Sequence, residues 1–331
     1  MNARRLFELD IARALCIVLV VVGHFAPEQS PNFFVIIRQW IYSFHMPVFF
    51  IISGYVWFRF RPDELSYAAL VKRKFQRLML PYFFASFAII VIKLLTQGNM
   101  SVNNPVNIYS FLHLFWKPEA GYFLWFVWTL FSLFLVVPLF RTRKHRLFLF
   151  AIMLLVHYII VVCNIDVSRF DVFAVGQTYR MAHWFLLGVI LAEYGIGLKR
   201  SRIVSLLCLC SFILCSLWFA FYPAYDEQSV PALLLPYLGI TSVLGISSFL
   251  TIHFDIVRPV LLMVGQSSFF IYLFHTTCMG FAKSLSLQYG CFLTPSGFWL
   301  QWGCVVAFGL LVPFVGHRIL IRYCPALKRY C

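Results

Sequence analysis

Charged side chains are scarce in this sequence, and acidic ones are the scarcest. Of the 331 residues only 12% are charged and only 12 are Asp or Glu, whereas 62% are hydrophobic. A soluble protein of this length needs far more charge on its water-facing surface. The composition therefore excludes a soluble globular protein and indicates a protein that lies largely in lipid.

Two further features are missing. The first apolar stretch, 11–25, contains Arg13 and is not followed by a small-x-small cleavage site, so we expect it to be retained and not removed as a signal peptide. The ten cysteines include no paired CxxC set with metal-ligand spacing. We interpret most of them as small core residues and expect no metal site.

The net charge of +15 could suggest nucleic acid as a partner. However, the basic residues occur in short clusters between apolar runs, which is typical of cytoplasmic loops beside anionic headgroups. We therefore expect membrane lipids, and not nucleic acid, around this protein.

Apolar runs predict the architecture. A helix needs roughly 20 residues to cross the hydrocarbon core, and backbone groups in lipid must be paired within the helix. The sequence predicts an all-α, polytopic helix bundle that forms a single integral membrane domain over 1–331. About ten spans are expected, near 9–27, 39–58, 78–97, 122–140, 147–163, 179–195, 203–222, 232–250, 261–284 and 299–320.

The basic residues also predict the orientation. If the N-terminus is cytoplasmic, twenty of the 27 Lys and Arg residues fall in cytoplasmic segments and four in the opposite loops. Cytoplasmic loops are enriched in Lys and Arg, so we expect both termini in the cytoplasm.

Polar residues within the expected spans are the candidates for function, because each is costly in lipid unless paired or used. On the first span, Asp10 and Arg13 are three residues apart and can pair. His24 follows Arg13 by eleven residues, about three turns, so both lie on one face. The alternative is that Arg13 reaches the headgroups and His24 bonds a carbonyl.

The second span carries His45, at about the depth expected for His24. Pro47 frees a backbone carbonyl one turn earlier. Ser53 and Gly54 fall near the depth of Arg13, where the missing bulk admits a ligand or another backbone. Close helix packing is the alternative explanation for these two residues.

Two pairs of candidates come next in the chain. The basic stretch 72–82 contains Arg73 and Arg77; it either anchors the topology or binds a phosphate-bearing ligand from the cytoplasm. Trp125 and Trp128 are expected in the outer part of the fourth span, where an aromatic belt is also expected.

These patterns together resemble the membrane acyltransferases of acyltransferase family 3. The family's Arg and His on the first helix correspond to Arg13 and His24, and its Phe-Phe-x-x-Ser-Gly-aromatic run to 49–55. A basic stretch ending in Arg-x-x-x-Pro-Tyr matches 77–82, and a late Gly-x-Ser segment leading to Tyr-Leu-x-His matches 265–275. Phe-His-Met-Pro at 44–47 is similar to the fucose 4-O-acetylase-like subgroup.

The resemblance implies an O-acyltransferase of the bacterial cytoplasmic (inner) membrane. It would move an acyl group, usually acetyl from acetyl-CoA, to a hydroxyl of a cell-envelope glycan or glycolipid precursor. His24 would act as general base or accept the acyl group itself, and His45 and His275 would orient the acceptor or stabilise the oxyanion. The donor would be bound by Arg13, Ser53, Gly54, Arg73 and Arg77, the acceptor by Trp125 and Trp128, and Asp10 would support Arg13.

Two other functions fit the same polar residues. A transporter or flippase for glycan precursors would also need a polar path across the bilayer. No inverted repeat and no carboxylate-rich coupling pathway is evident in the sequence, which favours the enzyme. A non-catalytic subunit of a polysaccharide-synthesis complex is the third possibility. The acceptor, the acyl group and the oligomeric state are open at this point.

Overall fold

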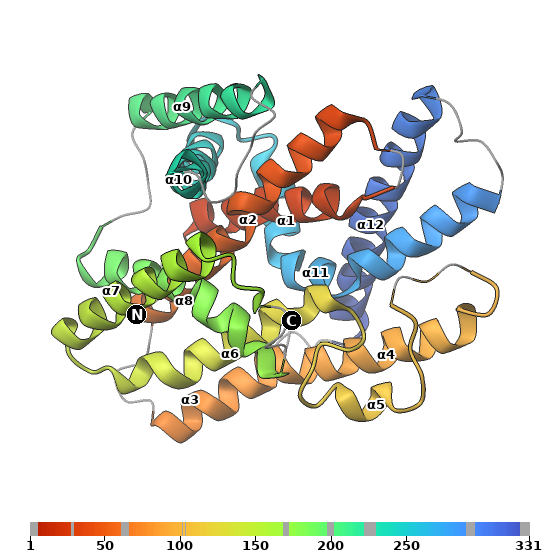
Figure 1. The fold of residues 1–331 in the computed structure, drawn as a ribbon, viewed down its shortest axis with the longest axis horizontal. Coiled ribbons are helices and arrows are strands. Elements are labelled where there is room, and N and C mark those ends of the chain that lie inside the picture. Colours follow the sequence, from red (N-terminus) through yellow and green to blue (C-terminus); the bar gives the residue numbers. More distant parts are fainter. Residues whose placement is uncertain are drawn as a thin grey trace. The chain divides into compact units, whose positions relative to one another are not determined.

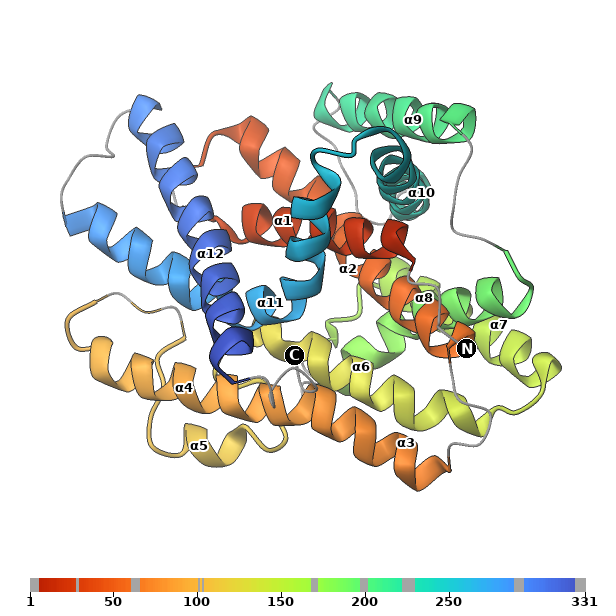
Figure 2. The ribbon, with the colours of Figure 1, turned by 180° about the vertical axis from the view of Figure 1, so that it is seen from behind.

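Helices are the only regular secondary structure in the residues that the structure describes (Figure 1 and Figure 2). The computed structural model describes residues 6–27, 30–60, 66–100, 102, 104–167, 172–196, 202–221, 230–288 and 295–324. The α-helices are α1 (Phe7–His24), α2 (Asn32–Arg59), α3 (Tyr67–Lys74), α4 (Leu80–Thr96), α5 (Ser110–His113), α6 (Trp125–Val136), α7 (Arg143–Val162), α8 (Val175–Glu193), α9 (Arg202–Phe221), α10 (Val230–His253), α11 (Arg258–Gln288) and α12 (Pro295–Tyr323). Short turns of other helix types are η1 (Phe75–Met79), η2 (Tyr122–Leu124), η3 (Val137–Leu139) and η5 (Val172–Ala174).

Among the described residues, seven helical stretches are long and apolar enough to cross a membrane. They are Asn32–Arg59, Tyr67–Thr96, Tyr122–Leu139, Arg143–Val162, Leu234–His253, Arg258–Leu287 and Gly297–Tyr323. Each of the ten predicted spans overlaps a helix, but α1, α8 and α9 are not among these seven. For α1 the reason lies in its composition, because Glu8, Asp10 and Arg13 are all charged.

The basic stretch after α2 differs most from the sequence prediction. We expected a cytoplasmic segment over 59–77, and residues 61–65 lie outside the described ones. Tyr67 to Met79 is helical and runs directly into α4 (Figure 1). The junction η1 is a π-helix, in which the Leu80 N–H bonds to the Phe75 carbonyl. Pro81 follows at the start of α4 and has no N–H for the Arg77 carbonyl, so a local change of helix type is expected there.

The helices pack as two compact units. The first lies within Met1–Arg61, Tyr158–Ile165 and His183–Ser268. In this unit α1 packs against α2, α10 packs against both, and α9 covers α10 (Figure 1). Stacking of the Trp40 ring on Phe212, with centroids 4.7 Å apart, joins α2 to α9.

The second unit lies within Pro62–His157, Asp166–Ala182 and Phe269–Cys331. Here α6 lies beside α3 and η1. The Phe131 ring is 6.1 Å from the Phe75 ring, and the Tyr67 hydroxyl donates to the Leu135 carbonyl at 2.8 Å. The helix α6 thus lies along the first half of the continuous helix Tyr67–Thr96, and the chain between α4 and α6 follows its second half.

Candidate functional site

Three rings from α1 and α2 gather at the C-terminal end of α1. The His24 ring is 5.9 Å from the Tyr42 ring, and the Tyr42 ring is 5.2 Å from the His45 ring. Both histidines meet Tyr42 edge to face. His45 is buried, whereas His24 is half-buried. The structure therefore brings together the two histidines that the sequence placed at similar depth, with a tyrosine between them.

Side chains of α2 also bind the last turn of α1. The carbonyl of Gly23 accepts hydrogen bonds from the Arg38 guanidinium Nε and from the Tyr42 hydroxyl, both at 3.1 Å. The last four carbonyls of a helix have no partner within it, so these two bonds cap α1. They fix the backbone of the residue directly before His24. We name His24, Arg38, Tyr42 and His45 the histidine cluster.

The sequence analysis missed Arg38 and Tyr42. The predicted second span, 39–58, left Arg38 just outside it, but the structure places Arg38 within α2. The available signal was the spacing of Arg38, Tyr42 and His45, at i, i+4 and i+7, which puts all three on one helix face. Nothing in the sequence showed that this face meets the end of α1.

Hydrogen bonding fixes the tautomer of His45. Its Nδ1 lies 2.5 Å from the Ile41 carbonyl. A carbonyl can only accept, so Nδ1 carries the proton and Nε2 keeps its lone pair. Nε2 is therefore the nitrogen of His45 that can accept a proton or a hydrogen bond from a hydroxyl.

A second cluster lies near the start of α1. The Arg13 Nη1 is 3.1 Å from the Asp10 Oδ1, the ion pair that their spacing predicts. Gly265 of α11 lies against this turn, because a Cβ atom there would be 2.0 Å from the Asp10 carbonyl oxygen. Arg13 and His24 are separated by about 16 Å of helix rise. The histidine cluster and the arginine are thus distinct places on one helix.

Gly54 is explained by helix packing. A Cβ atom at Gly54 would lie 2.0 Å from the Phe185 carbonyl oxygen, and one at Gly188 would lie 2.0 Å from that of Ile51. Glycines on α2 and α8 thus allow the two backbones to touch from both sides. Close packing was the alternative to donor binding for this residue. Ser53, its neighbour, is half-buried.

The second unit carries the other predicted residues. Arg73 on α3 and Arg77 on η1 are exposed and close enough for their charges to interact. Tyr82, which ends the same motif, is fully buried, and its hydroxyl lies 3.0 Å from the Leu114 carbonyl and 2.8 Å from the Lys117 carbonyl. The motif therefore combines two exposed cations with one buried anchor.

The two tryptophans of α6 lie in different surroundings. Trp128 is buried, and its ring meets Tyr82, Phe83 and Phe173 at 5.2 to 6.5 Å. This aromatic packing accounts for Trp128 without a ligand. Trp125 is half-buried and meets the Phe126 ring at 6.4 Å. Of the two, Trp125 has the ring surface better suited to a sugar.

His275 lies buried on α11. Its Nδ1 is 2.8 Å from the Tyr272 carbonyl, so Nδ1 carries the proton and Nε2 keeps its lone pair, as in His45. The His275 ring meets the Phe123 ring at 5.3 Å, and the Tyr272 hydroxyl donates to the Phe123 carbonyl. The turn η2 therefore positions His275 from the side.

Comparison with known proteins shows the family. The acyltransferase domain of acyltransferase family 3 matches residues 6–318, nearly the whole chain. No curated protein matches the chain, and no solved structure does. The family implies O-acyl transfer at a membrane, in agreement with the seven helices suited to crossing one. The chain is a multi-pass membrane protein that belongs to acyltransferase family 3.

Proposed function

We propose that this acyltransferase moves an acetyl group from cytoplasmic acetyl-CoA to a hydroxyl of a cell-envelope glycan or glycolipid precursor. In this proposal the protein lies in the bacterial inner membrane with ten spans and with both termini in the cytoplasm. The twenty-to-four distribution of basic residues supports the orientation. The resemblance of 44–47 to the fucose 4-O-acetylase-like subgroup supports a sugar acceptor.

The histidine cluster is the observation that carries the proposal. One imidazole of the pair takes the proton of the acceptor hydroxyl while the hydroxyl oxygen attacks the thioester carbonyl. The new C–O ester bond forms, the C–S bond breaks, and the CoA thiolate leaves and takes up the proton. We assign proton removal to His24, because it is the more accessible of the two. The Nε2 of His45 would accept a hydrogen bond from the acceptor sugar and orient it.

Arg38 and Tyr42 would act as positioning residues for His24. Both bind the Gly23 carbonyl, so they restrain the backbone from which the imidazole projects. A general base must lie within hydrogen-bond reach of the proton that it removes, and a displacement of about 1 Å can cost on the order of 100-fold in rate. The cap on α1 thus supports catalysis without contact with the substrate.

Arginines would bind the phosphates of the donor. Arg73 and Arg77 are exposed, so they are available to an anionic ligand from water. Arg13 is held by Asp10, which orients its planar guanidinium for bidentate binding. His275 would stabilise the oxyanion or orient the acceptor, and Trp125 would stack on the sugar. These roles rest on the sequence motifs together with the burial of each residue.

Replacement of His24 tests the proposal. His24→Ala should lower acetyl transfer at least about 100-fold, the lower end for loss of a general base. Membrane insertion and protein level should stay normal. His253→Ala is the matched control, because His253 is an exposed histidine of α10 in the same unit. Purified protein is assayed with acetyl-CoA and a glycan acceptor. Near-normal turnover in a well-expressed His24→Ala protein would refute the assigned role.

A further inference from the structure

The chain between α4 and α6 folds back along α4. Residues 104–121 form this connection, and α5 lies beside α4 within it (Figure 1 and Figure 2). The sequence analysis treated it as a loop outside the bilayer. Its contacts instead follow α4 from the end of the helix toward the start: Val106 binds Gln97, Phe111 meets Phe87, Phe115 meets Phe83, and Lys117 binds Tyr82.

The return path covers most of the bilayer thickness. From Gln97 to Tyr82 the helix spans fifteen residues, which is about 22 Å of rise. The hydrocarbon core is about 30 Å thick. Arg73 and Arg77 mark the other end of this helix, where headgroups are expected. The connection thus follows the C-terminal half of the helix Tyr67–Thr96, over a path of about 22 Å.

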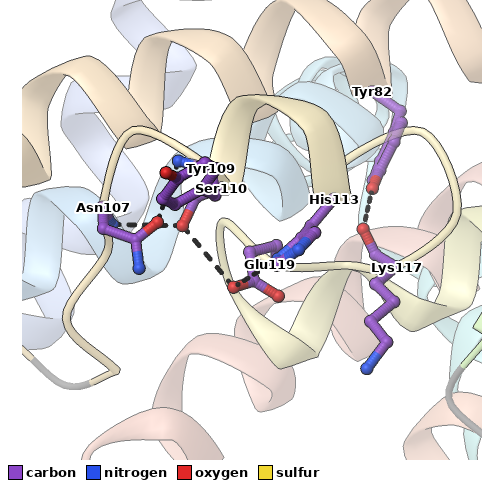
Figure 3. A network of polar contacts seen from close by, with 7 residues as sticks. All are labelled: Tyr82, Asn107, Tyr109, Ser110, His113, Lys117 and Glu119. Atoms are coloured by element: carbon purple, nitrogen blue, oxygen red, sulfur yellow. Dashed lines mark hydrogen bonds and ion pairs between the residues drawn. The ribbon is translucent and has the colours of Figure 1, made fainter.

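The backbone of the connection is paired as lipid requires. Eleven of the twelve N–H groups from Val106 to Lys117 donate to a partner within the protein. Eight of them bond to backbone carbonyls in successive turns, and the other three bond to the side chains of Gln97, Asn107 and Ser110. The Tyr82 hydroxyl also lies within hydrogen-bond distance of the Leu114 carbonyl and, as Figure 3 shows, of the Lys117 carbonyl. Irregular backbone is tolerated at membrane depth only when its polar groups are satisfied in this way.

The carboxylate of Glu119 in the connection is also paired. The Glu119 carboxylate lies 3.3 Å from the His113 Nδ1 and 3.5 Å from the Ser110 hydroxyl (Figure 3). Ser110 is fully buried, and its hydroxyl also accepts from the Asn107 N–H. An acidic group in contact with lipid is costly unless it is paired, and here a histidine and a hydroxyl supply the partners.

The outer side of the connection is apolar and continues the lipid-facing side of α4. Leu112 is 59% exposed, and Ile108, Tyr109 and Phe115 are exposed to a similar extent. On α4, Phe84 and Phe87 are exposed at 69% and 57%. The Phe87 ring meets Phe111 at 5.1 Å, which joins the two surfaces. Large exposed apolar side chains on a membrane-crossing helix face lipid acyl chains. The apolar side chains of the connection extend this surface, so they face acyl chains as well.

We propose that residues 104–121 form a re-entrant segment, embedded in the bilayer from the side where α4 ends, with lipid acyl chains against Ile108, Tyr109, Leu112 and Phe115. This inference rests on the membrane character of the chain and not on the proposed acetyl transfer. It also places in the membrane a connection that the predicted spans, 78–97 and 122–140, leave outside it.

Photolabelling from lipid tests the proposal on the unaltered protein. The purified chain is reconstituted with a phospholipid that carries a diazirine at the end of one acyl chain, and in parallel with one that carries it on the headgroup. After irradiation, labelled peptides are quantified by mass spectrometry. Residues 108–115 should be labelled by the acyl-chain probe within about twofold of residues 84–87, because the two stretches lie at similar depth.

Residues 97–100, at the end of α4, are the internal control. They should prefer the headgroup probe, whereas 108–115 should prefer the acyl-chain probe. Labelling of 108–115 by the headgroup probe alone, or by neither probe while 84–87 is labelled, would overturn the proposal. Loss of catalysis in the His24→Ala protein would leave this labelling unchanged, so the two proposals fail independently.

Discussion

Replacement of Gly54 by alanine would decide whether this motif glycine serves packing or donor binding. The added Cβ would lie 2.0 Å from the Phe185 carbonyl oxygen, whereas ordinary contact begins at 3.4 Å, so α2 and α8 must separate by about 1.4 Å. The three nearest atoms are the carbonyl oxygen and carbon of Phe185 and the nitrogen of Val189, and backbone atoms cannot rotate away. Overpacking of this kind costs about 1–3 kcal/mol. We therefore expect Gly54→Ala to lower the unfolding midpoint of the purified protein.

The reciprocal glycine sharpens the test. Gly188→Ala should cost a similar amount, because its Cβ would lie 2.0 Å from the Ile51 carbonyl oxygen. One separation of the helices relieves both contacts, so the double variant should cost clearly less than the two single variants added together. Gly280→Ala and Gly303→Ala are matched controls, since a Cβ atom at either helical site meets no atom within 4 Å.

Thermal unfolding in detergent measures the stability, and acetyl-transfer kinetics measure the KM for the donor. Under the packing explanation, Gly54→Ala lowers the midpoint, and it changes the donor KM no more than Gly188→Ala does. An unchanged midpoint with a raised donor KM, found for Gly54→Ala alone, would refute the packing explanation and favour donor binding.

Two further predictions concern single polar contacts. Arg13→Lys keeps the charge but loses the bidentate fork, so it should raise the donor KM with little effect on the acceptor KM. The control Arg258→Lys alters a similar ion pair, with Asp255 at 2.8 Å, and should change neither KM. A change in Arg13→Lys that is confined to the acceptor KM would mean that the donor binds elsewhere. Tyr82→Phe should destabilise the protein by about 1–3 kcal/mol, because it removes a hydrogen-bond donor from the carbonyls of buried Leu114 and half-buried Lys117. Tyr67 is exposed, so the control Tyr67→Phe should lower the free energy of unfolding by less than about 1 kcal/mol. Equal unfolding midpoints for the two variants would contradict the anchoring role of Tyr82.

The helices were predictable because lipid leaves the backbone little choice. Any apolar run of sufficient length must pair its own N–H and C=O groups, and every predicted span overlaps a helix. Helix ends were less predictable. We expected a span over 39–58, whereas α2 begins at Asn32, after Pro31. Apolarity reports the buried middle of a helix, and helical hydrogen bonding continues beyond it into polar sequence.

The irregular parts were not predictable from hydropathy. Residues 104–121 contain prolines, polar residues and charges, so their pattern indicates a loop in water. Their place beside α4 depends on pairings such as Gln97 with Val106 and Tyr82 with Lys117. These contacts form only after the chain has turned back, and single-sequence periodicity carries no information about them.

Within the candidate site, local pairs were predictable and distant ones were not. The ion pair of Asp10 and Arg13 follows from a spacing of three residues on one helix. The bonds from Arg38 and Tyr42 to the Gly23 carbonyl join residues 15 and 19 positions apart on two helices. Their existence depends on how α1 and α2 cross, which the sequence pattern leaves undetermined.

The glycines of the first unit show how the family motifs combine chemistry with support. Gly54 and Gly188 bring the backbones of α2 and α8 into contact, and Gly265 brings α11 against the Asp10 carbonyl. Asp10 in turn holds Arg13. A polar group within the membrane can bind or catalyse only if its position is fixed. Backbone contacts through glycine fix the position of a helix more firmly than side-chain packing does. The motif at 265–275 therefore contributes twice, since its first residue fixes the turn of α1 that carries the ion pair and its last residue is the buried His275.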